Sequence, residues 1–179
     1  MIRSFDGLVP QIAESAYVDE RATVVGDVRI EADASVWPGV VLRGDRGRIV
    51  VREGANVQDN ATVHEGSEIG PSATVGHNAI VHAATVGARS VIGMGAIVLD
   101  RGEVGAESIV AANSVVTPDT SIPDSVLAMG APAGFGRRST NPPGGKRRIA
   151  TSNSPADTRK PRRFSTERTS DSRSDRPAS

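Results

Sequence analysis

The feature that most restricts the fold of this chain is a ladder of aliphatic residues recurring about every six positions. Glycine or another small or polar residue usually follows each ladder residue, and a second small residue, often alanine, tends to fall four places after it. A period of six fits neither a helix nor a simple strand, so the chain is built from an internal repeat. The ladder residues are Val18, Val24, Ile30, Val36, Leu42, Val51, Val57, Val63, Ile69, Val75 and Val81, then, after a one-residue deletion, Val86, Ile92, Val98, Val104, Val110, Val116 and Ile122.

A repeat of this length predicts a triangular coil. Three repeats close one turn of 18 residues, with the aliphatic side chain inside and the small residue allowing the chain to bend at each corner. Successive turns would pair as parallel strands about 4.8 Å apart. Valine and isoleucine suit such half-buried, pleated surfaces. We therefore expect an all-β fold with roughly six turns between residues 18 and 122.

Charge divides the chain into two parts. Residues 1–136 carry 9 Arg, no Lys and 17 acidic residues, for a net charge of −8, whereas residues 137–179 carry 12 basic and 4 acidic residues, for +8. The second part is rich in Ser, Thr and Pro and lacks the ladder, which predicts a disordered basic tail. The first part would comprise a lead-in (1–17), the coils (18–122) and a closing segment (123–136). The tail could contact nucleic acid, but a solvated appendage is the favoured interpretation.

Composition excludes several classes of protein. The chain has no cysteine, so disulfides and thiolate metal sites are excluded. The N-terminus lacks a signal-peptide pattern, and no segment approaches the roughly 20 apolar residues of a membrane span. We expect a soluble cytoplasmic protein without a membrane partner.

The three histidines fall at informative places in the ladder. His64 and His82 each follow a ladder residue and are 18 residues apart, so they should point outward one above the other, at about 4.8 Å. Imidazoles placed in this way can bind one zinc ion at about 2.0–2.1 Å. His77 follows Val75 by two places and should lie on the adjacent side of the coil. In a trimer around a threefold axis it could reach a neighbour's pair, which predicts a shared three-histidine site with one position open to water.

Five sequence motifs surround the histidines and the ladder. They are Val36-Trp37-Pro38-Gly39-Val40-Val41-Leu42-Arg43-Gly44-Asp45, Asn56-Val57-Gln58-Asp59, Val63-His64, Val75-Gly76-His77-Asn78-Ala79-Ile80-Val81-His82 and Ile92-Gly93-Met94-Gly95-Ala96. These motifs resemble the γ-class carbonic anhydrases, whose fold is a left-handed parallel β-helix of hexapeptide repeats, and the resemblance covers roughly residues 5–134. It implies reversible hydration of carbon dioxide to bicarbonate through a metal-bound hydroxide, in a homotrimer that holds Zn²⁺, or Fe²⁺ or Co²⁺ in some members. The metal ligands would be His64 and His82 of one subunit with His77 of the next.

The resemblance also implies roles for five polar residues. Gln58 would orient the bound hydroxide or the substrate. Arg43 and Asp45 would form an ion pair at the subunit interface, which either positions bicarbonate or simply holds the trimer together. Asn56 and Asp59 match polar positions of the cleft, although both residue types also favour turns.

The chain departs from the family pattern in two places. The connection between His64 and His77 is too short for the acidic proton-shuttle loop of some members, and Glu65 is the carboxylate that could replace it. The family usually continues after Ala133 into a helix, whereas glycines and prolines oppose one here.

Two other functions fit a hexapeptide-repeat chain. One is an acyl- or acetyltransferase, which uses a single histidine as a general base beside an acyl-coenzyme A. The other is a metal-binding scaffold without catalysis. The three histidines at ligand spacing favour the carbonic anhydrase over both.

Overall fold

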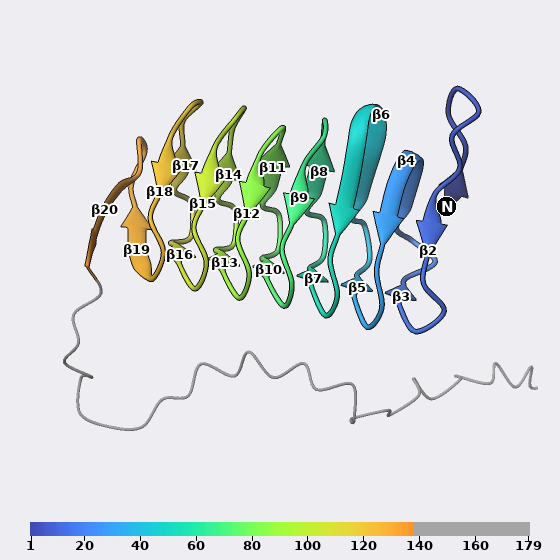
Figure 1. The fold of residues 1–179 in the computed structure, drawn as a ribbon, viewed down its shortest axis with the longest axis horizontal. Helices are drawn as coiled ribbons and strands as arrows, with labels where there is room; N and C mark the ends of the chain where they lie inside the picture. The colour runs from blue at the N-terminus through green and yellow to red at the C-terminus, as the bar shows by residue number, and fades with distance from the viewer. Residues whose placement is uncertain (138–179) are drawn as a thin grey trace, which may run out of the picture. The chain divides into compact units, whose positions relative to one another are not determined.

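In the computed structural model, which describes residues 1–137, the chain forms the expected parallel β-helix of the left-handed hexapeptide type (Figure 1). The predicted fold class is confirmed. Turns stack one after another from the N-terminal strands to β19 and β20. The predicted tail lies outside the described residues except for its first residue.

The described strands form the three sides of a triangular coil. Two sides belong to one twelve-stranded sheet, because the long strands β4 and β6 run around the corner between them. The strands of this sheet are β1 (Ile2–Arg3), β2 (Gln11–Ile12), β4 (Thr23–Ile30), β6 (Val41–Val51), β8 (Thr62–His64), β9 (Glu68–Ile69), β11 (Ile80–His82), β12 (Thr85–Val86), β14 (Ile97–Val98), β15 (Glu103–Val104), β17 (Val115–Val116) and β18 (Ser121–Ile122).

The third side is an eight-stranded sheet. All its pairings are parallel except the last, in which β20 runs antiparallel to β19. Its strands are β3 (Tyr17–Val18), β5 (Ser35–Val36), β7 (Asn56–Val57), β10 (Thr74–Val75), β13 (Val91–Ile92), β16 (Ile109–Val110), β19 (Val126–Met129) and β20 (Gly134–Arg137).

The core is the aliphatic ladder itself. Val57, Val63 and Ile69, one from each side of a turn, are fully buried, and alanines such as Ala61 fill the corners. The third residue after most ladder positions turns the corner with a positive φ, as at Asn60 (58°) and Asn78 (58°). Asparagine tolerates this left-handed conformation better than most residues, so the corner chemistry agrees with the repeat.

The turn containing β4 and β6 departs from the regular period. The register between these two strands shifts after Gly26, opposite Gly44, and β6 carries three extra residues between its ladder positions Leu42 and Val51. At Gly44 the backbones approach so closely that a Cβ would lie 2.4 Å from the carbonyl oxygen of Asp27. Gly44 is buried at this close contact, and its neighbours Arg43 and Asp45 have their side chains on the outer surface of the coil.

We expect Gly44→Ala to lower the free energy of unfolding by about 1–3 kcal/mol, the usual cost of forcing extra volume into a packed site. The added Cβ would lie closest to the backbone oxygen, carbon and nitrogen of Asp27, so no side chain can move aside to relieve the clash. Urea unfolding measures the change. Gly134→Ala is the control, because a Cβ there meets nothing within 4 Å and should change stability by less than about 0.5 kcal/mol. Equal stability of the two variants would contradict the expectation.

The closing segment ends in a strand rather than a helix. β20 pairs with β19 through Phe135, opposite Ala128, and Gly136, opposite Leu127. The expected loss of the family's helix is therefore observed as far as residue 137. Among residues 1–137 no helix is long and apolar enough to cross a membrane.

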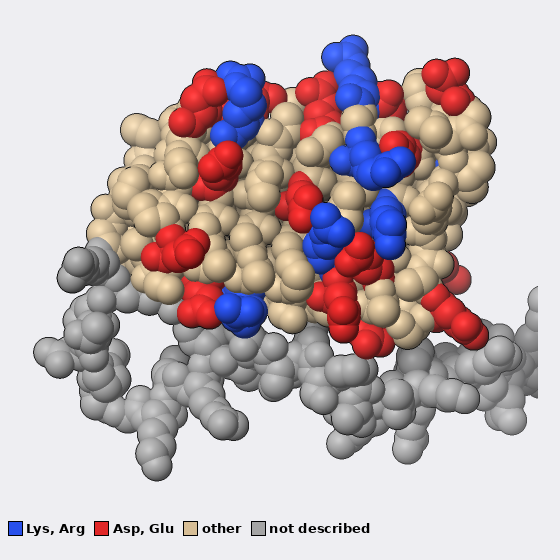
Figure 2. Space-filling model, in the orientation of Figure 1, with Lys and Arg blue, Asp and Glu red and all other residues tan. Residues whose placement is uncertain are grey.

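The surface of the coil is of mixed charge. Figure 2 shows acidic and basic side chains next to one another, and ion pairs such as Arg48–Asp27 (3.0 Å) and Arg101–Asp119 (2.6 Å) account for this. Exposed pairs of this kind stabilise the fold only weakly, because solvent screens the charges. With its net charge of −8, the body contrasts with the basic face of a nucleic-acid-binding domain.

Candidate metal centre

His64 and His82 lie side by side at the ends of β8 and β11. They are register partners in this parallel pair, as their spacing of 18 residues predicts. Their ring centroids are 5.0 Å apart, with the rings inclined at 67°. The repeat thus places two imidazoles on one side of the coil at the strand spacing.

The two histidines differ in exposure. His82 is half-buried, whereas His64 is 8% exposed, although the sequence predicts that both point outward. The difference arises because Arg43 is the register partner of His64 in the preceding turn and Asp45 follows it. Their side chains contact the His64 ring and cover it.

A carboxylate and a guanidinium occupy the two ring nitrogens of His64. Asp45 Oδ1 lies 2.9 Å from Nε2, and Arg43 Nη2 lies 3.2 Å from Nδ1. A guanidinium can only donate, so Nδ1 accepts from Arg43 and Nε2–H donates to Asp45. Arg43 Nε and Asp45 Oδ1 are also 3.4 Å apart, so the ion pair expected at a subunit interface forms within one chain.

These contacts affect the acidity of Asp45. Partial desolvation is the largest single influence and raises the pKa, but it is outweighed by hydrogen bonds from His64 and from its own backbone N–H, and by the charge of Arg43. The net pKa of Asp45 lies below its usual value. Asp45 is therefore held as a carboxylate at neutral pH.

His82 has a carboxylate partner that the sequence did not reveal. Its Nδ1 lies 2.9 Å from Asp100 Oδ1, while its Nε2 faces Glu65 Oε2 at 4.0 Å. Because one residue is missing from the repeat after Val81, Val81 pairs in register with Val98. The ladder therefore places Leu99, and not Asp100, above His82. Only the side-chain geometry brings Asp100 to the imidazole.

His77 lies on a different side of the coil. It follows β10 of the eight-stranded sheet, is half-buried, and has its Nδ1 3.0 Å from Asp59 Oδ2. Each of the three histidines is thus anchored by one aspartate. Carboxylate partners of this kind fix the tautomer and orientation of metal-binding histidines.

Gln58 and Asn56 flank the ladder residue Val57. Gln58 is half-buried and its backbone N–H donates to Val75 O at 2.9 Å. Asn56 is buried in β7, where its Oδ1 accepts from the Ser35 hydroxyl at 3.1 Å. Asn56 therefore links two successive coils of the β-helix. Asn56 and Asp59 are both residue types that favour turns, but Asn56 lies in a strand and only Asp59 lies in a turn.

The side chains that can converge on one ion within the described chain are His64, Glu65 and His82. One donor atom from each lies within 4.8 Å of the others. Two imidazoles and a carboxylate are the ligand types of zinc and of several other first-row metals. Asp45 holds the Nε2 proton of His64, so His64 can bind a metal only through Nδ1, and Arg43 must first leave that nitrogen. With Arg43 displaced, this donor set and its aspartate anchors fit a transition-metal ion.

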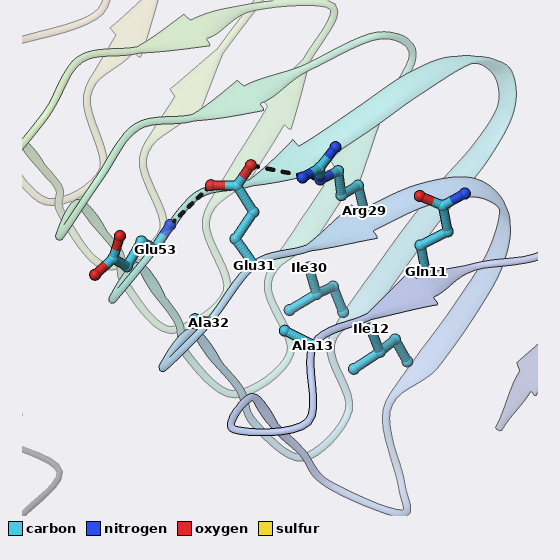
Figure 3. Close-up of a pocket in the computed structure, with 8 residues that line it drawn as sticks. All are labelled: Gln11, Ile12, Ala13, Arg29, Ile30, Glu31, Ala32 and Glu53. Atoms are coloured by element: carbon cyan, nitrogen blue, oxygen red, sulfur yellow. Dashed lines mark hydrogen bonds and ion pairs between the residues drawn. The ribbon is translucent and has the colours of Figure 1, made fainter.

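A second concave region, of about 510 Å³, lies away from the histidines between β2 and β4 (Figure 3). Glu31 at its centre pairs with Arg29 Nε at 3.5 Å and accepts from the backbone N–H of Glu53 at 3.3 Å. These neighbours already balance the negative charge of the Glu31 carboxylate, so it is not free to bind a ligand. We assign the region no function.

The fold and the paired imidazoles define a hexapeptide-repeat β-helix protein with a candidate metal centre. The chain is 40% identical over 137 residues to a carbonic anhydrase of Geobacillus kaustophilus, covering 74% of this chain and 75% of the relative. It is 39% identical over 142 residues to the mitochondrial gamma carbonic anhydrase 2 of Arabidopsis thaliana, covering 74% of this chain and 51% of the relative. The chain therefore spans about half the length of the plant relative.

Among solved structures, a hexapeptide transferase family protein of Anaplasma phagocytophilum is 40% identical, with a TM-score of 0.76, covering 78% of this chain and 85% of that one. No protein-family model matches the sequence. The curated similarities nevertheless extend over most of the coil. The chain belongs to the γ-class carbonic anhydrase family.

Proposed function

We propose that this protein is a metal-dependent carbonic anhydrase that hydrates carbon dioxide reversibly to bicarbonate. Its metal site would be shared within a homotrimer, with His64 and His82 from one subunit and His77 from the next. The observation that carries the proposal is the register pairing of His64 with His82, while His77 lies on the neighbouring side of the coil. Zn²⁺ is the expected ion, with Fe²⁺ or Co²⁺ as substitutes, and it would supply the Lewis acidity that ionises water near neutral pH.

The aspartates would act as positioning residues. Asp45 holds the Nε2 proton of His64, and Asp100 holds Nδ1 of His82 so that its Nε2 faces the site. Asp59 does the same for His77. Each carboxylate keeps its imidazole in one orientation, which raises its basicity as a ligand.

Gln58, Arg43 and Asn56 would serve the substrate side of the cleft. Gln58 would orient the attacking oxygen or the substrate through its amide. Arg43 donates to His64 but is half-exposed, so it can exchange that contact for the negative charge of bicarbonate. Asn56, buried and bonded to Ser35, would fix the turn that carries Gln58.

The test of this proposal is metal analysis of the purified protein combined with a carbon dioxide hydration assay. We expect about one transition-metal ion per protomer and hydration activity that a chelator removes and Zn²⁺, Fe²⁺ or Co²⁺ restores. A protein that purifies without metal and stays inactive after addition of all three ions would contradict it.

Asp100→Ala is expected to weaken zinc binding by about 10–100-fold, the usual effect of losing a carboxylate behind a metal-binding histidine. The His82 ring would then lose the partner that holds its Nδ1. Competition with a chromophoric chelator measures the affinity. Glu103→Ala, an exposed acid on β15, removes the same charge and should leave the affinity unchanged; an equal loss in both variants would point to net charge instead.

A second candidate function is acyl transfer, which the similarity to a hexapeptide transferase family protein supports. Such an enzyme would need one histidine as a general base and a bound acyl-coenzyme A. Acetyl transfer from acetyl-coenzyme A without added metal would favour acyl transfer over hydration.

A cytoplasmic location stays a prediction, and so does any nucleic-acid contact of residues 137–179.

A further inference from the structure

The backbone departs from the hexapeptide pattern directly after each of the two stacked histidines. In most repeats the third residue after the ladder position has the positive φ, as at Asn60 and Arg101 (both 58°). In the repeats that carry His64 and His82 the second residue has a positive φ, at Glu65 (47°) and Ala83 (46°), and after His64 the third residue, Gly66 (57°), keeps it as well. The left-handed conformation therefore begins one residue earlier at Glu65 than in the regular repeats.

At Glu65 this conformation brings a carboxylate toward the histidine pair. Its Oε2 lies 4.0 Å from His82 Nε2, the ring nitrogen that Asp100 leaves without a hydrogen bond. The side chain is 26% exposed, and one of its oxygens belongs to the group of donors within 4.8 Å of one another. Glu65 is therefore oriented into the site from the same chain that supplies both imidazoles.

The other ion pair of Glu65 is weak. Arg46 Nη1 lies 3.5 Å from Glu65 Oε1, and the Arg46 side chain is 75% exposed. Solvent screens an ion pair this exposed, so a metal ion would displace the guanidinium easily.

From this arrangement we infer that Glu65 completes a metal site within a single protomer. His64, His82 and Glu65 together hold a divalent transition-metal ion without the neighbour's His77. Two imidazoles and one carboxylate form the ligand set of a well-known class of zinc sites and of the facial triad of non-haem iron. The inference rests on the proposed function only in taking His64 and His82 as metal ligands.

This role has two consequences. A protomer can load its metal before it assembles, and His77 then joins or replaces Glu65 when the neighbouring subunit docks. A carboxylate ligand also neutralises part of the ion's charge, which a third imidazole does not. The in-chain site should therefore retain metal well but support hydration poorly.

The test compares metal binding by the full-length wild type, His77→Ala, Glu65→Gln and the double variant, titrated with Co²⁺ and Zn²⁺ alone. Affinity and the visible absorption of Co²⁺ are the readouts, and neither depends on catalysis. We expect His77→Ala to keep one ion per protomer, and Glu65→Gln in that background to weaken binding by at least about 100-fold, more than an outer partner accounts for. Glu68→Gln in the same background is the matched control, because Glu68 pairs with Arg52 on the next side of the coil.

The outcomes separate this inference from the proposed function. If His77→Ala loses its metal, Glu65 is not a ligand and the shared three-histidine site stands alone. If the double variant binds as tightly as His77→Ala, Glu65 is again not a ligand and the inference is overturned. If His77→Ala holds metal through Glu65 but the wild type hydrates no carbon dioxide, the in-chain site stands and the proposed activity fails. A wild type that binds neither ion overturns both. Melting curves without metal establish that each variant is folded.

Discussion

His82→Ala is expected to lower carbon dioxide hydration and zinc affinity by at least about 100-fold, since even the loss of an outer partner costs 10–100-fold. His82 is the residue on which the whole arrangement depends. Its ring meets the His64 ring edge-on with the centroids 5.0 Å apart, Asp100 anchors its Nδ1, and its Nε2 faces Glu65. Removing the imidazole leaves His64 without a second imidazole beside it among the described residues. Hydration rates and metal content of the same preparation measure both effects.

Thr117→Ala is the matched control for His82→Ala. Register pairing through β14 and β17 places Thr117 in the same column of the coil, two turns beyond His82. Its hydroxyl contacts only Thr120 in the described chain at 3.0 Å, so the variant should keep full activity and metal. Activity loss without metal loss in His82→Ala would mean that the residue acts on the substrate and not as a ligand.

The repeat allowed the fold and the placement of the histidines to be predicted, because both depend on the same period. Each turn of 18 residues returns the chain to the same side, so His64 and His82 had to align and His77 had to lie on another side. The left-handed coil and the buried ladder follow from the repeat and the family resemblance in the same way.

The carboxylates could not be predicted with the same accuracy. Asp100 contacts His82 although the ladder aligns Leu99 with it, since a side chain can reach one residue past its register position. Burial of His64 also depends on irregular structure, the register shift opposite Gly44 that brings Asp45 over the ring. Where the period breaks, contacts are decided by side-chain length and local backbone, which periodicity does not describe.

Mixing His77→Ala subunits with His82→Ala subunits should restore hydration activity that neither variant has alone. A His77→Ala subunit keeps the His64–His82 pair, and a His82→Ala subunit keeps His77. In a threefold ring assembled at random from equal amounts, about one quarter of the interfaces join an intact pair to an intact His77. Every trimer that contains both kinds of subunit has one such interface out of three, so we expect trimers selected by two different affinity tags to recover about a third of the wild-type rate after refolding of the mixture.

The recovery distinguishes a shared site from one that is complete in each subunit. If every subunit made its own catalytic site, mixed trimers would contain only damaged sites and the rate would stay at that of the separate variants. Mixing His77→Ala with the double variant His77→Ala/His82→Ala is the control, because no interface then regains three histidines. Mixed trimers without recovered activity would contradict sharing. A third outcome is recovered activity in the mixture together with metal retention in His77→Ala alone. It would show that the in-chain ligands hold the ion and that the neighbour's His77 makes it reactive. The reason is that replacing a carboxylate by a neutral imidazole leaves more of the ion's charge uncompensated.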